Sequence, residues 1–159
     1  MQNFEIPLGL GLEDPQIGRS LQIAFIEDTE EYQKTIPFEL LKQRERKPVP
    51  FHVIINPKTT IDENEYLEFF EGSLSVHDCM GIVPRARAVR VECLNEKAEP
   101  IVIEAKRWYA RISQHEIDHL AGNIFLDLVI TRSLTTEENY EKYWRNQSIE
   151  EVRQSLKNK

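Results

Sequence analysis

The chain has 159 residues, of which 40% are hydrophobic and 30% are charged, and its formal net charge is −7 at pH 7. This length and composition predict one globular domain that buries a sizeable core. Acidic residues are spread along the whole sequence and basic residues form no stripe, which argues against direct binding of nucleic acid or of an anionic membrane surface.

The cysteine content and the apolar runs predict a soluble, intracellular protein. Cys79 and Cys93 are too few for a disulfide framework and are not spaced as CxxC. The longest apolar runs are too short to cross a bilayer, and the N-terminal stretch "MQNFEIPLGLG" has neither the basic flank nor the apolar centre of an export signal.

The first predicted element is a half-buried strand over residues 20–27, in which Leu21, Ile23 and Phe25 recur at every second position. The acidic stretch "EDTEEY" that follows is expected to be a loop. Residues 37–47, "PFELLKQRERK", start with proline and continue in good helix formers, which predicts a short, solvent-facing helix.

The middle of the chain is predicted to be rich in strands. β-Branched and aromatic residues are frequent over residues 51–56, 65–75 and 81–94. Apolar side chains alternate along one face of the last of these strands, namely Val89, Val91 and Cys93. The polar turn "NEKAEP" then joins it to "IVIEAK", which predicts a hairpin with a loose loop.

The apolar residues adopt a helical period after the hairpin. "RWYARISQHEIDHLA" predicts a helix over residues 107–121, followed by Gly122, which suits the left-handed position of a helix C-cap. Thr135 and Glu138 form a capping box that predicts a second amphipathic helix packed on the sheet. The box recurs in "SIEEVRQ", so the tail over residues 147–159 is predicted to be helical or frayed.

Two histidines one turn apart mark the predicted central helix. Trp108, Ile112, His115 and His119 share one face of this helix. Imidazoles in this spacing can hold one metal ion, while Glu116, about 100° round the helix, can act as a base toward a water on that ion. The alternative is that both histidines pack in a core or face solvent, and the motif itself does not identify a third ligand.

The remaining histidines and cysteines are weaker candidates. We expect His52, in a predicted strand, and His77, in a predicted loop, to be structural or solvent-facing. Cys93 alternates with core valines and is expected to be a small buried hydrophobe. Cys79 lies in the predicted loop after "EGSLS", which leaves open whether it lies near the site.

Three stretches, "GLGLEDPQIG", "EGSLS" and "QHEIDHL", resemble the motifs of the peptide deformylases in order and approximate spacing. The similarity covers residues 9–146 and leaves 147–159 as a tail. The tryptophan before "ARI" and the "YW" pair near the end resemble the organellar type. The resemblance implies an α+β fold in which short, mostly antiparallel strands surround a central helix that carries HExxH.

The function implied by the resemblance is removal of the formyl group from the N-terminal formylmethionine of nascent proteins at the ribosome. The cofactor would be Fe²⁺, with Zn²⁺ as a substitute, held by one cysteine and two histidines. The implied partners are formylmethionyl peptides, without nucleic acid or membrane. The compartment would be the cytoplasm or, in a eukaryote, the mitochondrion or plastid, although the sequence shows no presequence rich in arginine and serine.

By position, the resemblance makes His115 and His119 metal ligands. Glu116 would be the general acid and base. Ser73 stands where the family has its metal-binding cysteine. A thiolate is a charged, soft donor, whereas a serine hydroxyl is neutral and weakly donating, so metal affinity is expected to drop. Cys79 lies too far along the chain to replace that ligand unless the loop is rebuilt.

The resemblance also implies how the substrate would be held. Gln16 and the backbone N–H of Leu74 would stabilise the oxyanion, and the backbone of Gly11 would pair with the peptide as with an added strand. The pocket for the methionine side chain would be lined by Phe69, Trp108 and Ile112.

Two further features depart from the family pattern. Glu13 and Asp14 replace two alanines, which adds bulk and negative charge near the peptide unless both side chains face solvent. Only a short stretch precedes Gly9, where the family has a helix, so the chain would be a fragment, a mis-started product or a degenerate paralogue. Apolar surface that the helix covers is then expected to be exposed.

Three hypotheses follow from these residues. The leading one is an active or weakened deformylase, favoured by Glu116 and the two histidines. Its alternative is a catalytically impaired deformylase-like protein that keeps the fold and a peptide-binding groove, favoured by Ser73 and by the two acidic residues in the glycine-rich motif. The third, an HExxH peptidase, needs a distant ligand, and the "EGSLS" and "GLGLEDPQ" stretches argue against it.

Overall fold

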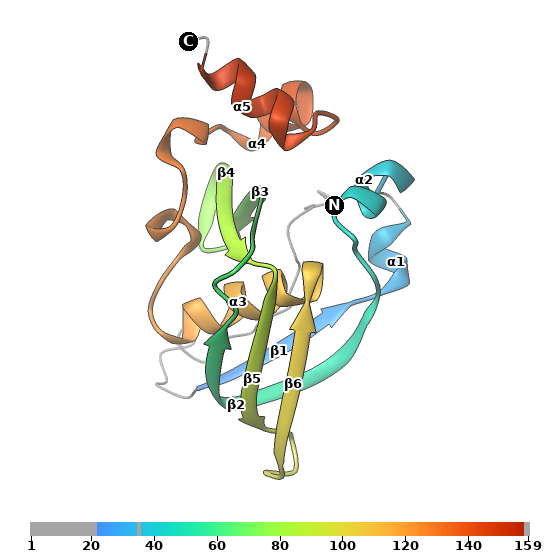
Figure 1. Ribbon diagram of the computed structural model, residues 1–159, viewed down its shortest axis with the longest axis vertical. Coiled ribbons are helices and arrows are strands. Elements are labelled where there is room, and N and C mark those ends of the chain that lie inside the picture. Colours follow the sequence, from blue (N-terminus) through green and yellow to red (C-terminus); the bar gives the residue numbers. More distant parts are fainter. Residues whose placement is uncertain (1–21, 35, 158–159) are drawn as a thin grey trace. The chain divides into compact units, whose positions relative to one another are not determined.

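The computed structural model describes residues 22–34 and 36–157 (Figure 1). The chain divides into two compact units: the described residues up to Tyr66 with Ala86–Asn123, and Leu67–Arg85 with the described residues from Ile124 onward. Within this described part, no helix is long and apolar enough to cross a membrane. Helices occur beside antiparallel strands, which confirms the predicted α+β class.

The first unit is built on a four-stranded sheet with the order β1-β2-β5-β6. Each neighbouring pair is antiparallel, and the strands are β1 (Ile23–Asp28), β2 (Val49–Ile61), β5 (Ala88–Leu94) and β6 (Pro100–Lys106). β5 and β6 form the predicted hairpin, and the Asn95 N–H closes its turn on the Glu99 carbonyl at 3.0 Å.

Helix α3 (Arg107–Leu120) lies against this sheet and contacts β1, β5 and β6 (Figure 1). The alternating side chains predicted on β5 are all buried, as are three on the helix: Val89, Val91, Cys93, Trp108, Ala110 and Ile112. Burial of a large apolar side chain contributes roughly 1.5–3 kcal/mol, so this layer fixes the helix on the sheet.

The buried face of β1 differs from the prediction. Its buried side chains are Ala24, Ile26 and Asp28. Ile23 and Phe25 are only half-buried, and Phe25 stacks on Phe51 with ring centroids 5.9 Å apart. Leu21 lies outside the described residues. The period of two was predicted correctly, but the face was wrong because a small alanine and a paired aspartate face inward.

Asp28 is buried as one partner of an ion pair. Arg46 donates from Nε to Oδ2 and from Nη2 to Oδ1, each at 2.7 Å, and Gln33 Nε2 adds a bond to Oδ2 at 3.2 Å. The helix predicted over residues 37–47 is α2 (Phe38–Gln43), which ends before Arg46. Glu45 adopts a left-handed φ of 48°, which turns the chain so that Arg46 reaches Asp28.

A short helix, α1 (Glu30–Gln33), replaces the loop predicted after β1. Thr29 caps this helix by accepting a hydrogen bond from the Tyr32 N–H at 3.3 Å. Glu30 and Glu31 lie in the first turn, where acidic side chains interact favourably with the helix dipole.

Strands β3 (Tyr66–Ser73) and β4 (Val76–Ala86) pair with each other and, apart from Tyr66 and Ala86 at their ends, belong to the second unit. His77 and Cys79 lie in β4 and not in the predicted loop, because the turn after Ser73 is only two residues long. The later elements are η2 (Phe125–Asp127), η3 (Thr131–Ser133), α4 (Glu137–Asn139), the π-helix η4 (Tyr140–Trp144) and α5 (Ile149–Lys157).

Ser133 holds the segment around η3 to β4. Its Oγ accepts a hydrogen bond from the Ile82 N–H at 2.7 Å and donates one to the Ile130 carbonyl at 2.6 Å. Ile130 also donates from its backbone to the Ile82 carbonyl at 2.9 Å. Gly81 is required beside this contact, because an added Cβ would lie 2.4 Å from Val129 Cγ2.

The second predicted amphipathic helix differs in its cap and its form. Thr136, and not Thr135, caps α4, because Thr135 pairs with Met80 through two backbone bonds of 2.9 Å. The helix continues as η4, where Tyr140 packs on Phe70 of β3 with ring centroids 4.9 Å apart.

The capping box predicted in the tail is confirmed. Glu151 accepts from the Ser148 N–H at 2.7 Å, and the Glu151 N–H donates to Ser148 Oγ at 3.3 Å. α5 follows this cap, and Val152 on it is buried. The division into a domain over residues 9–146 and a tail over 147–159 stays a prediction.

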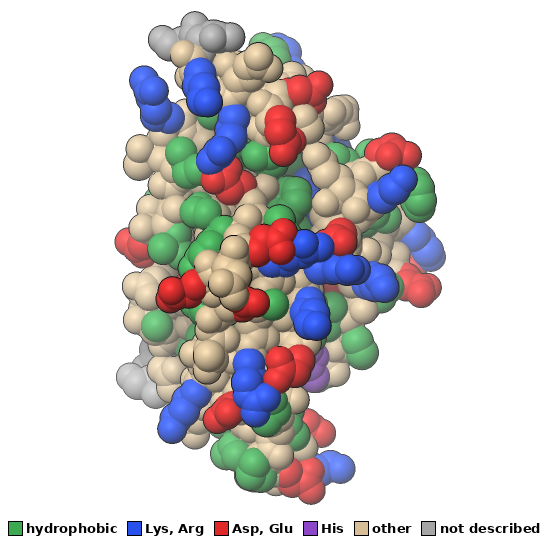
Figure 2. Space-filling model, viewed as in Figure 1, with side chains coloured by type: hydrophobic (Ala, Val, Ile, Leu, Met, Phe, Trp, Pro, Cys, Tyr) green, Lys and Arg blue, Asp and Glu red, His purple; other side chains and the backbone are tan. Residues whose placement is uncertain are grey.

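Charges of both signs are interspersed on the surface shown in Figure 2. In the first unit, Arg87 pairs with Glu65 at 2.8 Å and with Glu45 at 2.9 Å, and Arg90 pairs with Glu104 at 2.6 Å. Exposed pairs of this kind contribute about 0–1 kcal/mol each, so the fold depends on its buried layer.

Tyr109 of α3 is bonded to His52 of β2. The Tyr109 hydroxyl lies 2.8 Å from His52 Nε2, and His52 Nδ1 lies 2.8 Å from the Pro50 carbonyl. The carbonyl can only accept, so Nδ1 carries the proton and the tyrosine hydroxyl donates to Nε2. His52 is therefore structural in this unit, as predicted.

Replacing Tyr109 by phenylalanine is expected to remove a loss of stability at alkaline pH. Burial, with a smaller effect of Cys93, raises the pKa of Tyr109 from 10.0 to about 12 in the folded chain. The contribution of protonated Tyr109 to the free energy of unfolding is therefore fully present below about pH 10 and is lost as the pH rises toward about 12. Allowing for the partial exposure of the ring, the loss should be about 1–2 kcal/mol.

Urea unfolding of both proteins at about pH 9 and about pH 11.5 measures this loss. The hydrogen bond to His52 is absent from Tyr109→Phe at both pH values. The quantity compared is therefore the change in unfolding free energy between the two pH values in each protein. An equal alkaline loss in both proteins would assign it to other groups, such as Cys93, whose pKa is also raised by burial.

Candidate functional site

The end of α3 holds the two histidines of the predicted motif. Gly122 adopts the left-handed φ of 82° that was predicted for the C-cap. Its N–H donates to the His119 carbonyl, and the Asn123 N–H donates to the Asp118 carbonyl, each at 2.9 Å. This pair of bonds completes the last turn of the helix, so the segment that carries His119 is not frayed.

The imidazoles of His115 and His119 converge. Their Nε2 atoms lie 3.0 Å apart, and the rings are nearly perpendicular at 87°. Both side chains are buried, with 4% and 9% exposure. The alternative in which both face solvent is therefore wrong, and each ring presents the same nitrogen to one common point.

This geometry fits a divalent ion. Two nitrogens that each bind a tetrahedral zinc at about 2.0–2.1 Å are roughly 3.4 Å apart, so a small spreading of the rings is sufficient. One Nε2 can donate its proton to the other while both are neutral, and this proton must leave when both bind a metal.

Glu116 is one of the two acidic residues between the histidines, and it is only 2% exposed. A carboxylate is a group that can exchange a proton with a reacting water when the two are within hydrogen-bond distance. Among the described residues, however, no group of three or more histidine, cysteine, aspartate or glutamate side chains is arranged to hold a metal. The helix brings two imidazoles together.

Ser73, the predicted third ligand, ends β3 in the second unit. It is 9% exposed, and its Oγ accepts a hydrogen bond from the Ser75 N–H at 3.2 Å. Leu74, whose N–H was predicted to face the oxyanion, lies in the turn that follows and has a side chain that is 53% exposed. A hydroxyl that stabilises a tight turn is a weaker donor to a metal than a thiolate.

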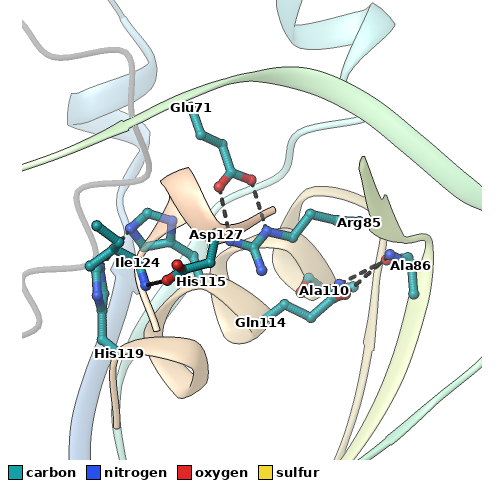
Figure 3. A network of polar contacts seen from close by, with 9 residues as sticks. All are labelled: Glu71, Arg85, Ala86, Ala110, Gln114, His115, His119, Ile124 and Asp127. Atoms are coloured by element: carbon teal, nitrogen blue, oxygen red, sulfur yellow. Dashed lines mark hydrogen bonds and ion pairs between the residues drawn. The ribbon is translucent and has the colours of Figure 1, made fainter. Parts of the chain in front are cut away.

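The structure also contains a buried ion pair that the sequence did not predict. Arg85 donates from Nε to Glu71 Oε1 at 3.0 Å and from Nη2 to Oε2 at 2.9 Å (Figure 3). Glu71 is fully buried and Arg85 is 3% exposed. Both lie in stretches that resemble the family, "EGSLS" and "VPRARAV", but their pairing crosses from β3 to β4.

The residues predicted to line the methionine pocket are buried. Phe69 lies on β3 with 9% exposure, while Trp108 and Ile112 lie on α3 with 1% and 0%. The Trp108 ring also faces three guanidinium groups, with Arg44, Arg46 and Arg111 at 5.1, 5.2 and 5.9 Å from its centre. This contact with cations was not predicted from the sequence.

Some predicted site residues cannot be placed. Gly11 and Gln16 lie outside the described residues, as do the two acidic residues of the glycine-rich stretch, Glu13 and Asp14. Their roles therefore remain predictions from the sequence.

Comparison with known proteins identifies the family. The sequence model of the polypeptide deformylase family matches residues 1–134. The chain is 42% identical to the chloroplastic peptide deformylase 1A of Solanum lycopersicum over 82% of its own length and 47% of that protein. It is 38% identical to peptide deformylase 3 of Streptomyces avermitilis over 93% of its length and 64% of that protein.

Solved structures agree with this match. The peptide deformylase of Ehrlichia chaffeensis has a TM-score of 0.62 and 30% identity, over 94% of this chain and 75% of that one. The deformylase of Acinetobacter baumannii, solved with Met-Ala-Ser bound, has a TM-score of 0.62 and 28% identity, over 76% of this chain and 70% of that one.

The chain spans between about half and two thirds of the length of the curated relatives named above, 47% in one and 64% in the other. A third relative is the mitochondrial peptide deformylase of Homo sapiens, 35% identical over 79% of this chain. The predicted resemblance, including that to organellar forms, is confirmed. The chain belongs to the polypeptide deformylase family.

Proposed function

We propose that this protein is a metal-dependent hydrolase that removes the formyl group from N-terminal formylmethionine. The observation that carries the proposal is the buried, convergent pair of His115 and His119 beside Glu116 in a chain of the deformylase family. In the reaction, the oxygen of water bonds to the formyl carbon and the carbon–nitrogen bond breaks. Formate and a free α-amino group are released.

His115 and His119 would hold the ion, with Ser73 as the third protein group. Fe²⁺ is the metal expected from the family resemblance, and Zn²⁺ suits the same nitrogen ligands. When bound, the ion supplies Lewis-acid polarisation of the formyl carbonyl. The residues of the chain perform the remaining steps.

Glu116 takes a proton from the attacking water and returns it to the leaving nitrogen, because its carboxylate is held in a buried place next to a ligand. Gln16 and the backbone N–H of Leu74 stabilise the oxygen on which charge develops. The backbone of Gly11 aligns the peptide as an added strand.

The substrate side chain is proposed to be methionine. The pocket lining is proposed to be Phe69, Trp108 and Ile112, because a flexible thioether fills an apolar slot without desolvating a charge. The natural substrates would be the N-termini of nascent chains at the ribosome. The compartment would be one in which translation starts with formylmethionine: a bacterial cytoplasm, a mitochondrion or a plastid.

A second candidate is a catalytically impaired deformylase-like protein. Ser73 favours it, because a hydroxyl brings no negative charge to a divalent ion and already accepts a bond from the Ser75 N–H. This protein would keep the fold and bind peptides without hydrolysing them at a useful rate.

Formate release from formyl-Met-Ala-Ser in the presence of Fe²⁺ under anaerobic conditions tests the proposal. Wild-type protein should release formate and hold one ion per chain, whereas His119→Ala should lose both activity and metal. His77→Ala is the matched control, because His77 is exposed on β4 and belongs to no proposed ligand set. Equal metal content in wild type and His119→Ala would remove α3 as the metal site.

A further inference from the structure

The side chain of Gln114, the residue before His115, forms hydrogen bonds with the backbone of Ala86 in the same unit. Its Oε1 accepts from the Ala86 N–H at 3.1 Å, and its Nε2 donates to the Ala86 carbonyl at 2.8 Å (Figure 3). Nε2 also donates to the Ala110 carbonyl of its own helix at 2.9 Å. The side chain is 7% exposed, so these three bonds form inside the protein.

The amide of Gln114 imitates a neighbouring strand. Ala86 is the last residue of β4, and β5 begins at Ala88, so the backbone here lies between two ladders. A carboxamide is the side chain that offers an acceptor and two donors in one plane, which matches the N–H and carbonyl of a single residue. Both backbone groups of Ala86 are thereby satisfied without a partner strand.

This contact also fixes how α3 is turned about its axis. The helix is tied at its first turn, where the Arg107 N–H donates to the Arg87 carbonyl at 2.7 Å. The bonds of Gln114 to Ala86 add a second attachment two turns later, at the neighbouring strand residue. Two attachments at different heights oppose both rotation and sliding of the helix.

We propose that Gln114 is a positioning residue. By fixing the rotation of α3 relative to the sheet, it sets the direction in which His115, His119 and Glu116 project from the helix. Because α3 supplies two ligands, any further ligand belongs to another element, and the set is complete only when the helix has one orientation. The inference rests on the proposed function in that the positioned groups are taken as a metal site.

The test compares Gln114→Met with Gln33→Met. Methionine is of similar length to glutamine but neither donates nor accepts in this way. Gln33 is a matched control, because it is also buried in the first unit, at 8% exposure, and donates to Asp28. Each variant is prepared in the wild-type and the Ser73→Cys background, and its Co²⁺ affinity, Co²⁺ absorption spectrum and unfolding free energy are measured.

Gln114→Met is expected to weaken Co²⁺ binding by on the order of 10–100-fold and to change the absorption bands of the bound ion. Gln33→Met should leave both unchanged even though the protein is less stable. The Ala86 amide should also exchange its proton faster in Gln114→Met, because its acceptor is gone. If Gln114→Met retains wild-type affinity, or if both variants lose affinity in proportion to stability, the inference is wrong.

These outcomes separate the inference from the proposed function. Formate release together with a Co²⁺ affinity that is insensitive to Gln114 would overturn the inference alone. Co²⁺ binding that depends on Gln114 without formate release would overturn the proposed function alone. Absence of Co²⁺ binding in both backgrounds would overturn both.

Discussion

Glu71→Gln is expected to lower the free energy of unfolding by about 3–5 kcal/mol. The carboxylate of Glu71 is fully buried and receives two hydrogen bonds from Arg85, whose side chain is 3% exposed. Removing the negative charge leaves a guanidinium in a place that water does not reach. Its desolvation is then no longer offset by the opposite charge.

Urea unfolding of Glu71→Gln beside Glu65→Gln measures the effect. Glu65 pairs with Arg87 at the surface, so its loss should change stability by less than about 1 kcal/mol. The double variant Glu71→Met/Arg85→Met should recover most of the stability, since an apolar pair of similar volume replaces two buried charges. If Glu71→Gln and Glu65→Gln have equal effects, the buried pair carries no special stability.

The central helix and its motif could be predicted from the sequence because their determinants are local. The spacing of His115 and His119 already places both side chains on one face, and Gly122 marks the end of the helix. The Ser148 capping box is likewise formed within one turn. Each of these features depends on residues that are close together in the chain.

Two long-range contacts could not be predicted in this way. Glu71 and Arg85 are fourteen positions apart, and Gln114 and Ala86 are twenty-eight apart. Which acidic residue meets which arginine depends on how β3 pairs with β4, and the sequence pattern does not specify this. The sequence motifs that contain these residues indicated a family, but they did not indicate which residues these side chains contact.

The buried face of β1 and the division into two compact units were not predicted, and each has a physical reason. Hydrophobicity alone favoured Ile23 and Phe25 as the inner side chains, but the pairing of Asp28 with Arg46 brings the other face inward. The second unit joins Leu67–Arg85 to residues after Asn123, so no single composition change marks its boundary.

Ser73→Cys is expected to raise the hydrolysis of formyl-Met-Ala-Ser by at least about tenfold, equivalent to about 1.4 kcal/mol of activation free energy. A thiolate at this position adds a negative charge and a soft donor to the two imidazoles, so metal affinity should rise in the same variant. Formate release and metal content per chain measure the two effects.

Two controls separate ligation from a general effect of a new thiol. Ser75→Cys places the thiol in the same turn at an exposed position and should leave activity and metal content at wild-type values. With Co²⁺, only Ser73→Cys should show absorption from charge transfer between sulfur and the metal. Glu116→Gln in the Ser73→Cys background should abolish the gain, because no base remains to take the proton of the attacking water.

If instead Ser73→Cys folds, binds one ion and still releases no formate, the third ligand is not what limits the reaction. The impaired deformylase-like protein would then be the better description, with Glu13 and Asp14 in the glycine-rich stretch as the next residues to restore to alanine.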